Sequence, residues 1–281
     1  MEINARTKLI CLIGNPVEHS FSPNMHNAAF DQLGLNFCYL ALKVEKEDLG
    51  EALKGVKAMN FWGMNVTIPH KEAVIPLLDE VEEEAEFIGA VNTVKRVDDR
   101  LVGYNTDGRG FMESLKESGI NPGGMNVFML GAGGASRAVS YHLSKVASKI
   151  FIFDTDQKKG LMLVRDLKRV NDNVVLTGDK KNIKSADIVI NATPLGLRED
   201  DPLPVESDLL TKRKVVCDLI YWETPLLKTA RERGCTVMNG LGMLLWQGVL
   251  AFTIWTGVNP PVDLMRDTLM RQIEKKRADS Y

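Results

Sequence analysis

Several patterns that mark whole classes of protein are missing from this 281-residue sequence. Its four cysteines have no CxxC spacing, which is typical of core thiols in a reducing compartment rather than of a disulfide framework. The four histidines share no metal-ligand spacing with one another or with the cysteines, so we expect no metal site. These residues are Cys11, Cys38, Cys217, Cys235, His19, His26, His70 and His142.

An excess of one charge and long apolar runs are missing as well. The formal net charge of −2 gives no electrostatic reason to expect a nucleic acid or a membrane as partner. No apolar run reaches the ~20 residues that a membrane-spanning helix needs. The run at 9–13 is too short for a signal peptide and continues directly into Gly14-Asn15-Pro16. The composition, 44% apolar and 26% charged, therefore predicts a soluble, cytoplasmic, globular protein.

A glycine-rich stretch, GAGGASR at 131–137, is the most informative feature that is present. It follows an apolar run at 127–130 that is typical of a buried parallel strand, and it leads into residues with helical spacing. Missing side chains at such a turn let backbone N–H groups approach a pyrophosphate, so we expect a bound dinucleotide; a tight turn without a ligand is the alternative. A second apolar run ends in Asp154, 23 residues after Gly131, where an acid is expected to bind the adenosine ribose.

Strands alternate with helices along almost the whole chain, which predicts an α/β protein with mostly parallel sheets. We expect strands at 9–13, 37–44, 63–68, 91–104 (a two-stranded stretch), 127–130, 150–153, 174–176, 188–190 and 215–219. Helices are expected at 23–33, 47–59 and 108–118, from His70 with its regularity interrupted by Pro76, and twice after Gly240. The best linker is NPGG at 121–124, so a boundary near residue 121 separates an N-terminal domain from a cofactor domain.

Seven short motifs follow one another along the chain. They are GNPVEHSFSP at 14–23, NVTIPHK at 65–71, GAVNT at 89–93, GYNTDG at 103–108, NATPLG at 191–196, DLIY at 218–221 and GLGMLLWQG at 240–248. In order and spacing, this set resembles the shikimate dehydrogenase family, including its quinate/shikimate branch. The resemblance implies a substrate-binding and catalytic domain over 1–121, a doubly wound Rossmann-type NAD(P)-binding domain over 122–240, and C-terminal helices over 241–281 that pack back on the substrate domain.

The resemblance also implies which residues bind the ligands. The substrate, which is shikimate, 3-dehydroshikimate or quinate, is expected at Ser20, Ser22, Asn65, Thr67, Lys71, Asn92, Asp107, Tyr221 and Gln247. The cofactor, NAD or NADP, is expected at Gly131, Ala132, Gly133, Gly134, Ala135, Arg137, Asp154, Thr193, Pro194, Leu219, Gly240 and Met243.

Hydroxyl and amide side chains suit a polyhydroxylated ring carboxylate, because each polar group of a buried ligand needs a partner. Ser20 and Ser22 are two residues apart before a Pro-started helix, so in an extended segment both can face a carboxylate. Capping of that helix is the alternative for Ser22. The alternatives for Thr67, Asn92 and Gln247 are a helix cap, a turn residue and a glutamine bonded to backbone.

Lys71 and Asp107 are the expected catalytic pair. Hydride transfer between an alcohol carbon and nicotinamide requires a proton to leave or reach the oxygen. In the family, the lysine and the aspartate of the matching motifs both contact the hydroxyl that is oxidised, whereas each residue alone is more often a surface lysine or a helix N-cap. At ~4 Å and an effective dielectric constant of ~20, a carboxylate attracts an ammonium by about 4 kcal/mol. We therefore expect a largely protonated lysine that donates a proton when a ketone is reduced.

The residues after the second Rossmann strand depart from the commonest family pattern. NADP-using members have Asn-Arg-Ser/Thr there, whereas this chain has Asp-Thr-Asp at 154–156. At an effective dielectric constant of ~20, Asp154 should repel the 2′-phosphate of NADP by several kcal/mol. Exposed pairs with Lys158 or Lys159 are worth only ~0–1 kcal/mol. We therefore expect NAD, with NADP bound through Arg137 as the alternative.

The loop YWETP at 221–225 is a second departure, because it is shorter than the family's loop and leaves the placement of Tyr221 open. The resemblance implies an oxidoreductase that interconverts 3-dehydroshikimate and shikimate, on the way to aromatic amino acids. An NAD-dependent quinate/shikimate dehydrogenase of catabolic role and a non-catalytic dinucleotide-binding sensor are the alternatives. Retention of both Lys71 and Asp107 argues against the sensor. We expect small-molecule partners only, and a monomer or homodimer.

Overall fold

The computed structural model describes residues 2–198 and 200–278, which fall into two compact units. The first unit contains the described residues up to Thr106 and those from Gln247 onward, and the second runs from Asp107 to Trp246. The sequence instead predicts domain boundaries near residues 121 and 240. The unit boundary comes earlier because the helix at 107–117 packs against the helix that follows the glycine stretch.

A mixed six-stranded sheet with the order β2-β1-β3-β5-β6-β4 forms the centre of the first unit. β1 pairs in parallel with β2 and β3, whereas β5 is antiparallel to both β3 and β6. The elements are β1 (Lys8–Gly14), α1 (Ser22–Gln32), β2 (Phe37–Lys43), α2 (Leu49–Ala58), β3 (Gly63–Val66), η1 (Ile75–Leu77), β4 (Glu80–Val81), α3 (Glu83–Ile88), β5 (Thr93–Val97), β6 (Arg100–Tyr104) and α9 (Val262–Ala278). α8 (Leu241–Thr256) begins in the second unit and ends in the first.

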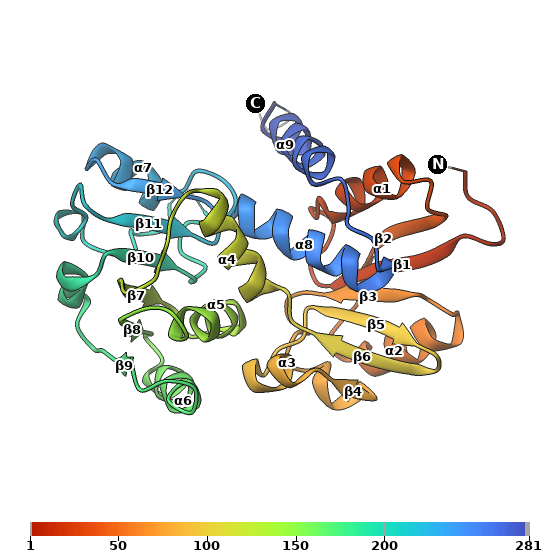
Figure 1. Ribbon diagram of the computed structural model, residues 1–281, viewed down its shortest axis with the longest axis horizontal. Coiled ribbons are helices and arrows are strands. Elements are labelled where there is room, and N and C mark those ends of the chain that lie inside the picture. The colour runs from red at the N-terminus through yellow and green to blue at the C-terminus, as the bar shows by residue number, and fades with distance from the viewer. Residues whose placement is uncertain (1, 199, 279–281) are drawn as a thin grey trace. The chain divides into compact units, whose positions relative to one another are not determined.

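The apolar run of β1 is buried from Ile10 onward, as expected for a central strand with both faces covered. Pro23 lies in the first turn of α1, where its missing N–H is tolerated, and α9 lies alongside α1 (Figure 1). The indole Nε1 of Trp255 on α8 donates to the Val94 carbonyl at 2.9 Å. The C-terminal helices therefore complete the first unit, which confirms that prediction.

The helix predicted from His70 is replaced by a turn. The Val74 N–H donates to the His70 carbonyl at 2.9 Å, as in an α-helix, but Pro76 has no N–H with which to continue the ladder. The chain forms η1 instead, followed by β4 and α3, which the sequence analysis misses. Lys71 accordingly lies in a turn after β3 and not on a helix.

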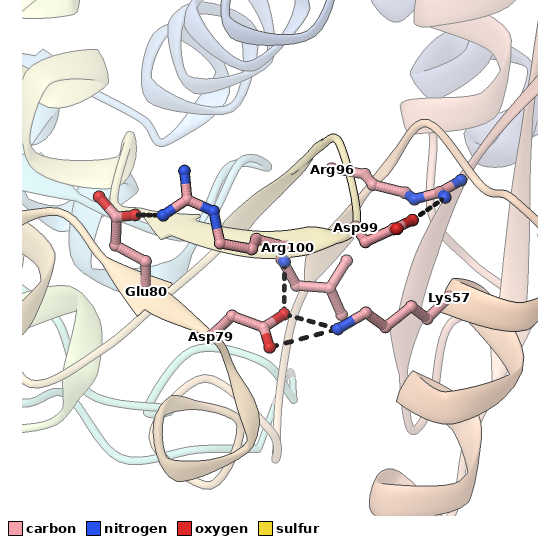
Figure 2. A network of polar contacts seen from close by, with 7 residues as sticks. Lys57, Asp79, Glu80, Arg96, Asp99 and Arg100 are labelled. Carbon is pink, nitrogen blue, oxygen red and sulfur yellow. Dashed lines mark hydrogen bonds and ion pairs between the residues drawn. The ribbon is translucent and has the colours of Figure 1, made fainter.

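Polar contacts connect the β5–β6 hairpin to neighbouring segments (Figure 2). Asp79 accepts hydrogen bonds from the Leu101 N–H at 2.7 Å and from Lys57 Nζ at 3.0 Å. Arg100 pairs with Glu80 at 3.0 Å. The bond from Leu101, followed by the bond from Lys57, holds the pKa of Asp79 below its ordinary value.

The second unit contains an all-parallel sheet with the order β12-β11-β10-β7-β8-β9. This is the doubly wound Rossmann order, with β7 as the first strand, and it confirms the predicted fold class. The elements are α4 (Asp107–Glu117), β7 (Asn126–Leu130), α5 (Gly134–Ser144), β8 (Lys149–Phe153), α6 (Gln157–Leu167), β9 (Val174–Leu176), η2 (Lys180–Ser185), β10 (Ile188–Asn191), η3 (Ser207–Leu209), β11 (Val215–Asp218), α7 (Pro225–Glu232) and β12 (Thr236–Met238). α6 contacts β9 near one edge of the sheet and α7 contacts β12 at the other (Figure 1). The strands carry buried apolar side chains into this unit's own core.

Within residues 2–198 and 200–278, His, Cys, Asp and Glu side chains form no cluster of three that suits a metal ion. None of the described helices combines the length and the apolar character that crossing a membrane requires.

Candidate active site

Two buried asparagines link three segments of the first unit. Asn65 lies on β3, and its Nδ2 donates to the Asn92 carbonyl at 2.9 Å and to Thr93 Oγ1 at 3.0 Å. Asn92 Oδ1 accepts from the Thr106 N–H at 2.8 Å, and Asn92 Nδ2 donates to Thr106 Oγ1 at 2.9 Å. Asn92 is thus more than a turn residue, because its side chain joins the start of β5 to the segment that leads into α4.

Ser20 and Ser22 lie where the chain enters α1. The Ser22 N–H donates to Ser20 Oγ at 3.3 Å, and Ser22 is buried. α1 begins at Ser22 itself, and its N-cap residue, Phe21, makes no capping side-chain bond. Ser22 therefore does not cap the helix, and both serines stay candidates for the substrate carboxylate.

Thr67 and Lys71 follow β3 in the turn that replaces the predicted helix. The Thr67 N–H donates to the Ile13 carbonyl at 3.0 Å. A Cβ on Gly14 would lie 2.3 Å from Thr67 Cγ2, so glycine at this position lets the end of β1 approach Thr67. Lys71 is half-buried, and its carbonyl accepts from the Val91 N–H at 2.8 Å. Because no α-helix begins after Thr67, this residue is not a helix cap.

Asp107 is 5% exposed and is the first residue of α4, where the helix dipole favours a carboxylate. The next residue packs directly on α5. A Cβ on Gly108 would lie 2.3 Å from the Ala138 carbonyl oxygen and 2.4 Å from His142 Cδ2. The orientation of α4, and of Asp107 at its start, is thus set by a contact with α5 that only glycine allows.

The glycine stretch forms the turn between β7 and α5, as predicted. Gly131 has a φ of +98°, and a Cβ there would lie 2.9 Å from the Ala192 carbonyl oxygen. Ser136 Oγ donates to the Gly131 carbonyl at 2.6 Å and closes the turn. Gly133 is the exposed N-cap residue of α5, so the start of the helix is accessible to an anion. The first turn of α5 contains Gly134 and Ala135.

Asp154 lies directly after β8 and accepts two backbone hydrogen bonds. Its Oδ2 accepts from the Ala132 N–H at 2.7 Å, and its Oδ1 accepts from the Asp156 N–H at 2.8 Å. Arg137 donates to Asp166 on α6 at 2.7 Å, with side chains that are 18% and 33% exposed. The sequence analysis misses both arrangements, since neither follows from a motif.

A buried carboxylate, Asp218, is a site candidate that the sequence analysis misses. It accepts hydrogen bonds from Asn191 Nδ2 at 3.1 Å, the Ile220 N–H at 3.1 Å and Thr224 Oγ1 at 2.8 Å. Asn191 Oδ1 in turn accepts from Thr193 Oγ1 at 2.6 Å. Burial raises the pKa of Asp218. The carboxylate joins the segments after β10 and β11; its place at a strand end, within the DLIY motif, is the signal that was available.

Four further predicted residues follow the ends of β10, β11 and β12. Pro194 is exposed, and Leu219 lies against Gly240, where a Cβ would come within 2.0 Å of the Leu219 carbonyl oxygen. Burial raises the pKa of Tyr221, whose ring meets Trp222 edge to face at 4.9 Å between centroids. The Tyr221 side chain is half-buried.

Met243 and Gln247 lie on α8, four residues apart, with Met243 buried and Gln247 half-buried. Hydrogen bonds join Asn65 to Asn92 on one side and to Tyr39 on the other. Lys71 belongs to the first unit and Asp107 to the second, so their pairing stays a prediction.

The residues around β7 and β8 fit a dinucleotide. Gly131 leaves a space that any Cβ would fill, and Gly133 exposes the start of α5. Asp154 lies at the strand end where an adenosine ribose is expected. A Rossmann sheet with this turn, joined to a second α/β unit that carries buried polar side chains, is typical of a dinucleotide-linked dehydrogenase.

Comparison with known proteins identifies the family. Residues 12–94 match the shikimate dehydrogenase substrate binding domain, and residues 240–270 match the shikimate 5′-dehydrogenase C-terminal domain. The chain is similar to the shikimate dehydrogenase (NADP(+)) of Desulforamulus reducens, with 46% identity over 97% of this chain and 98% of that protein. The chain belongs to the shikimate dehydrogenase family.

Solved structures of relatives share the fold over nearly the whole chain. A shikimate dehydrogenase in complex with NADP+ superposes with a TM-score of 0.93 at 43% identity, covering 97% of this chain and 98% of that one. Shikimate 5-dehydrogenase from Listeria monocytogenes, in complex with shikimate and NAD, gives a TM-score of 0.89 at 38% identity, covering 96% and 98%. The first of these complexes contains NADP+ and the second contains NAD.

Proposed function

We propose that this protein is a shikimate dehydrogenase, which reversibly reduces 3-dehydroshikimate to shikimate with a nicotinamide dinucleotide. The observation that carries the proposal is the similarity to shikimate dehydrogenases over nearly the full length of both proteins. The chain has kept Lys71 and Asp107 in the motifs where the family has its catalytic lysine and aspartate, which supports an enzyme over a silent sensor.

Each predicted site residue has a proposed role in proton transfer or in substrate binding. The bound nicotinamide supplies or accepts the hydride. Lys71 donates a proton to the oxygen of the reacting carbon as the ketone is reduced and takes it back in the reverse direction, while Asp107 binds the same oxygen. Ser20 and Ser22 bind the substrate carboxylate. The ring hydroxyls are bound by Asn65, Thr67, Asn92, Tyr221 and Gln247.

NAD is the proposed cofactor of choice. Asp154 places a negative charge at the expected ribose position, where it accepts hydrogen bonds from ribose hydroxyls and opposes a 2′-phosphate. Arg137, the rival phosphate ligand, is already paired with Asp166 at 2.7 Å. The glycine turn, Thr193, Pro194, Leu219, Gly240 and Met243 hold the remainder of the dinucleotide. The enzyme is further proposed to be a cytoplasmic monomer or homodimer with small-molecule partners only.

Steady-state rates with shikimate and with quinate, each measured with NAD and with NADP, test this proposal. We expect the highest kcat/KM for shikimate with NAD. A higher kcat/KM for quinate would favour the catabolic alternative, for which the acid at Asp154 is the supporting observation. Dinucleotide binding by calorimetry without turnover of either substrate would instead show a sensor and refute the proposed function.

A further inference from the structure

β2 is an edge strand of the sheet in the first unit. Among the described strands, β1 alone is hydrogen-bonded to it. The Val44 N–H, directly after β2, donates to the Gly14 carbonyl at 3.0 Å, so the even-numbered residues of β2 turn their backbone groups toward β1. The odd-numbered residues within 37–43 therefore turn their N–H and C=O groups toward the open edge.

The first half of this edge is already occupied. The Phe37 N–H donates to the Leu35 carbonyl at 2.8 Å. Asn27 of α1 supplies both partners of the next residue: its Nδ2 donates to the Tyr39 carbonyl at 2.9 Å, and its Oδ1 accepts from the Tyr39 N–H at 2.8 Å. The side-chain amide of Asn27 thus stands in the place of a neighbouring strand, and no second strand can pair with β2 at Tyr39.

The second half of the edge is open. Within residues 2–198 and 200–278, no group hydrogen-bonds the backbone of Ala41 or Lys43 from this side. Leu40 and Leu42 point to one face of the sheet and are 38% and 37% exposed. The ammonium group of Lys43 is balanced by Glu45 at 2.8 Å. An open edge with exposed leucines and a balanced charge favours pairing with another strand.

Antiparallel pairing with the same strand of a second copy satisfies these open groups. Because Tyr39 is blocked, the pairing has to use Ala41 and Lys43. With Ala41 opposite Lys43 of the second copy, the two residues exchange both N–H···O bonds, and the two-fold axis repeats the pair. Leu42 then lies opposite Leu42 of the second copy, in a non-hydrogen-bonded pair where side chains approach closely. No two like charges lie directly opposite each other.

We propose that the edge of β2 is the interface of a symmetric homodimer, in which residues 41–43 of two copies pair antiparallel and join the two sheets into one. A second copy is the partner because the segment is complementary to itself: its donors meet its own acceptors, and its leucine meets the same leucine. The inference decides between the monomer and the homodimer that the proposed function leaves open, and it does not depend on the reaction.

Sedimentation velocity of the whole protein tests the assembly, and the native particle should have twice the chain mass of 31.3 kDa. Ala41→Pro removes an N–H that faces away from β1, and proline is tolerated at such edge positions. Leu42→Lys places two like charges against each other across the axis. Either change should raise the dissociation constant of the dimer at least about 30-fold, because it acts twice in each dimer.

Leu161→Lys is the matched control, because it makes the same substitution at a leucine of α6 that is 59% exposed and lies in the second unit. It should leave the dissociation constant of the dimer unchanged. Circular dichroism checks that each variant is folded. Leu42→Lys keeps the test decisive if Ala41→Pro disturbs the strand, because it changes an exposed side chain and leaves the backbone intact.

Cysteine cross-linking tests the register. Leu42→Cys should form a disulfide between the two copies on mild oxidation, because its side chain lies opposite its own copy. Leu40→Cys should not, since four residues, or ~13 Å at ~3.3 Å per residue, separate it from its copy along the strand. The native cysteines, Cys11, Cys38, Cys217 and Cys235, are buried and do not compete.

A native particle with the mass of one chain would overturn the inference. A dimer that persists unchanged in both Ala41→Pro and Leu42→Lys would also overturn it, because another surface would then join the copies. Cross-linking through Leu40→Cys and not through Leu42→Cys would overturn the register. Absence of shikimate turnover in a dimeric native protein would refute the proposed function and leave this inference intact.

Discussion

Replacing Asp154 by asparagine and Thr155 by arginine should reverse the cofactor preference of this protein. Two unit charges ~5 Å apart repel by about 3 kcal/mol at an effective dielectric constant of ~20 and by about 1 kcal/mol in water. Asp154 is half-buried, so its repulsion of a 2′-phosphate lies between these limits, and the native chain should favour NAD in kcat/KM by at least about tenfold, or ~1.4 kcal/mol. Adding a bidentate arginine brings the total change to about 2–4 kcal/mol in favour of NADP.

The structure shows that this exchange has a second effect. Both oxygens of Asp154 accept backbone N–H groups, from Ala132 at 2.7 Å and from Asp156 at 2.8 Å. Asparagine replaces one of these acceptors by a donor, which loosens the glycine turn and costs about 1–3 kcal/mol with either cofactor. The assay must therefore compare the ratio of kcat/KM values for NAD and NADP, and not the separate values.

Asp156→Asn is the matched control, because it removes the same formal charge one residue beyond Thr155. Asp156 caps α6 by accepting from the N–H groups of Lys158 and Lys159, and asparagine caps a helix equally well. We expect the NAD/NADP ratio to change less than about threefold in this control, since an exposed charge is largely screened. An equal change in control and test variants would show that the ratio reflects net charge alone.

Asp166→Asn tests whether the ion pair with Asp166 keeps Arg137 from binding the 2′-phosphate of NADP. It removes the negative charge that pairs with Arg137 at 2.7 Å, so the guanidinium should attract a 2′-phosphate more strongly, and kcat/KM should rise several-fold for NADP and stay unchanged for NAD. A native protein that already prefers NADP would refute the ranking of charges on which this reasoning depends, and would identify Arg137 or the lysines after Asp156 as the dominant phosphate ligands.

Two other perturbations give equally definite results. Lys71→Ala should lower kcat by about 10²- to 10⁴-fold, with substrate affinity by calorimetry within about tenfold, because the lost group acts mainly in the transition state; near-normal kcat in the folded variant would contradict the role of Lys71. Asp79→Asn should lower the free energy of unfolding at pH 7 by no more than about 1 kcal/mol, since the ion pair is exposed. The folded-state pKa of Asp79 is depressed below the ordinary value of 3.8, so its contribution to stability is present above that pH and is lost as pH falls through the lowered pKa. The difference in free energy of unfolding between native protein and variant, measured by denaturant titration, should therefore be smaller at about pH 3 than at pH 7. An equal difference at both pH values would argue against the assignment.

The order of strands and helices could be predicted from the sequence because periodicity and glycine punctuation are local signals. The glycine turn at Gly131 and the alternation of the second unit are examples. The helix expected from His70 failed for a reason that was visible in the sequence, since Pro76 can make no hydrogen bond to the preceding turn.

The parts of the site that the sequence could not provide are contacts between segments far apart in the chain. The pairing of Arg137 with Asp166 and the bond from Tyr39 to Asn65 join different elements, and neither lies within a motif. A motif identifies which residue types are present, whereas the direction in which an amide or a guanidinium points depends on partners brought in by the fold.

The close approach at Gly108 has a mechanical consequence. Its α-carbon meets the Ala138 carbonyl with backbone against backbone, so no side-chain rotamer is available to absorb a displacement between α4 and α5. The two helices are therefore held in fixed contact, with Asp107 at the N-terminus of α4 and the glycine turn at the N-terminus of α5. Any side chain at position 108 would force α4 away from α5 and so displace Asp107 relative to the glycine turn.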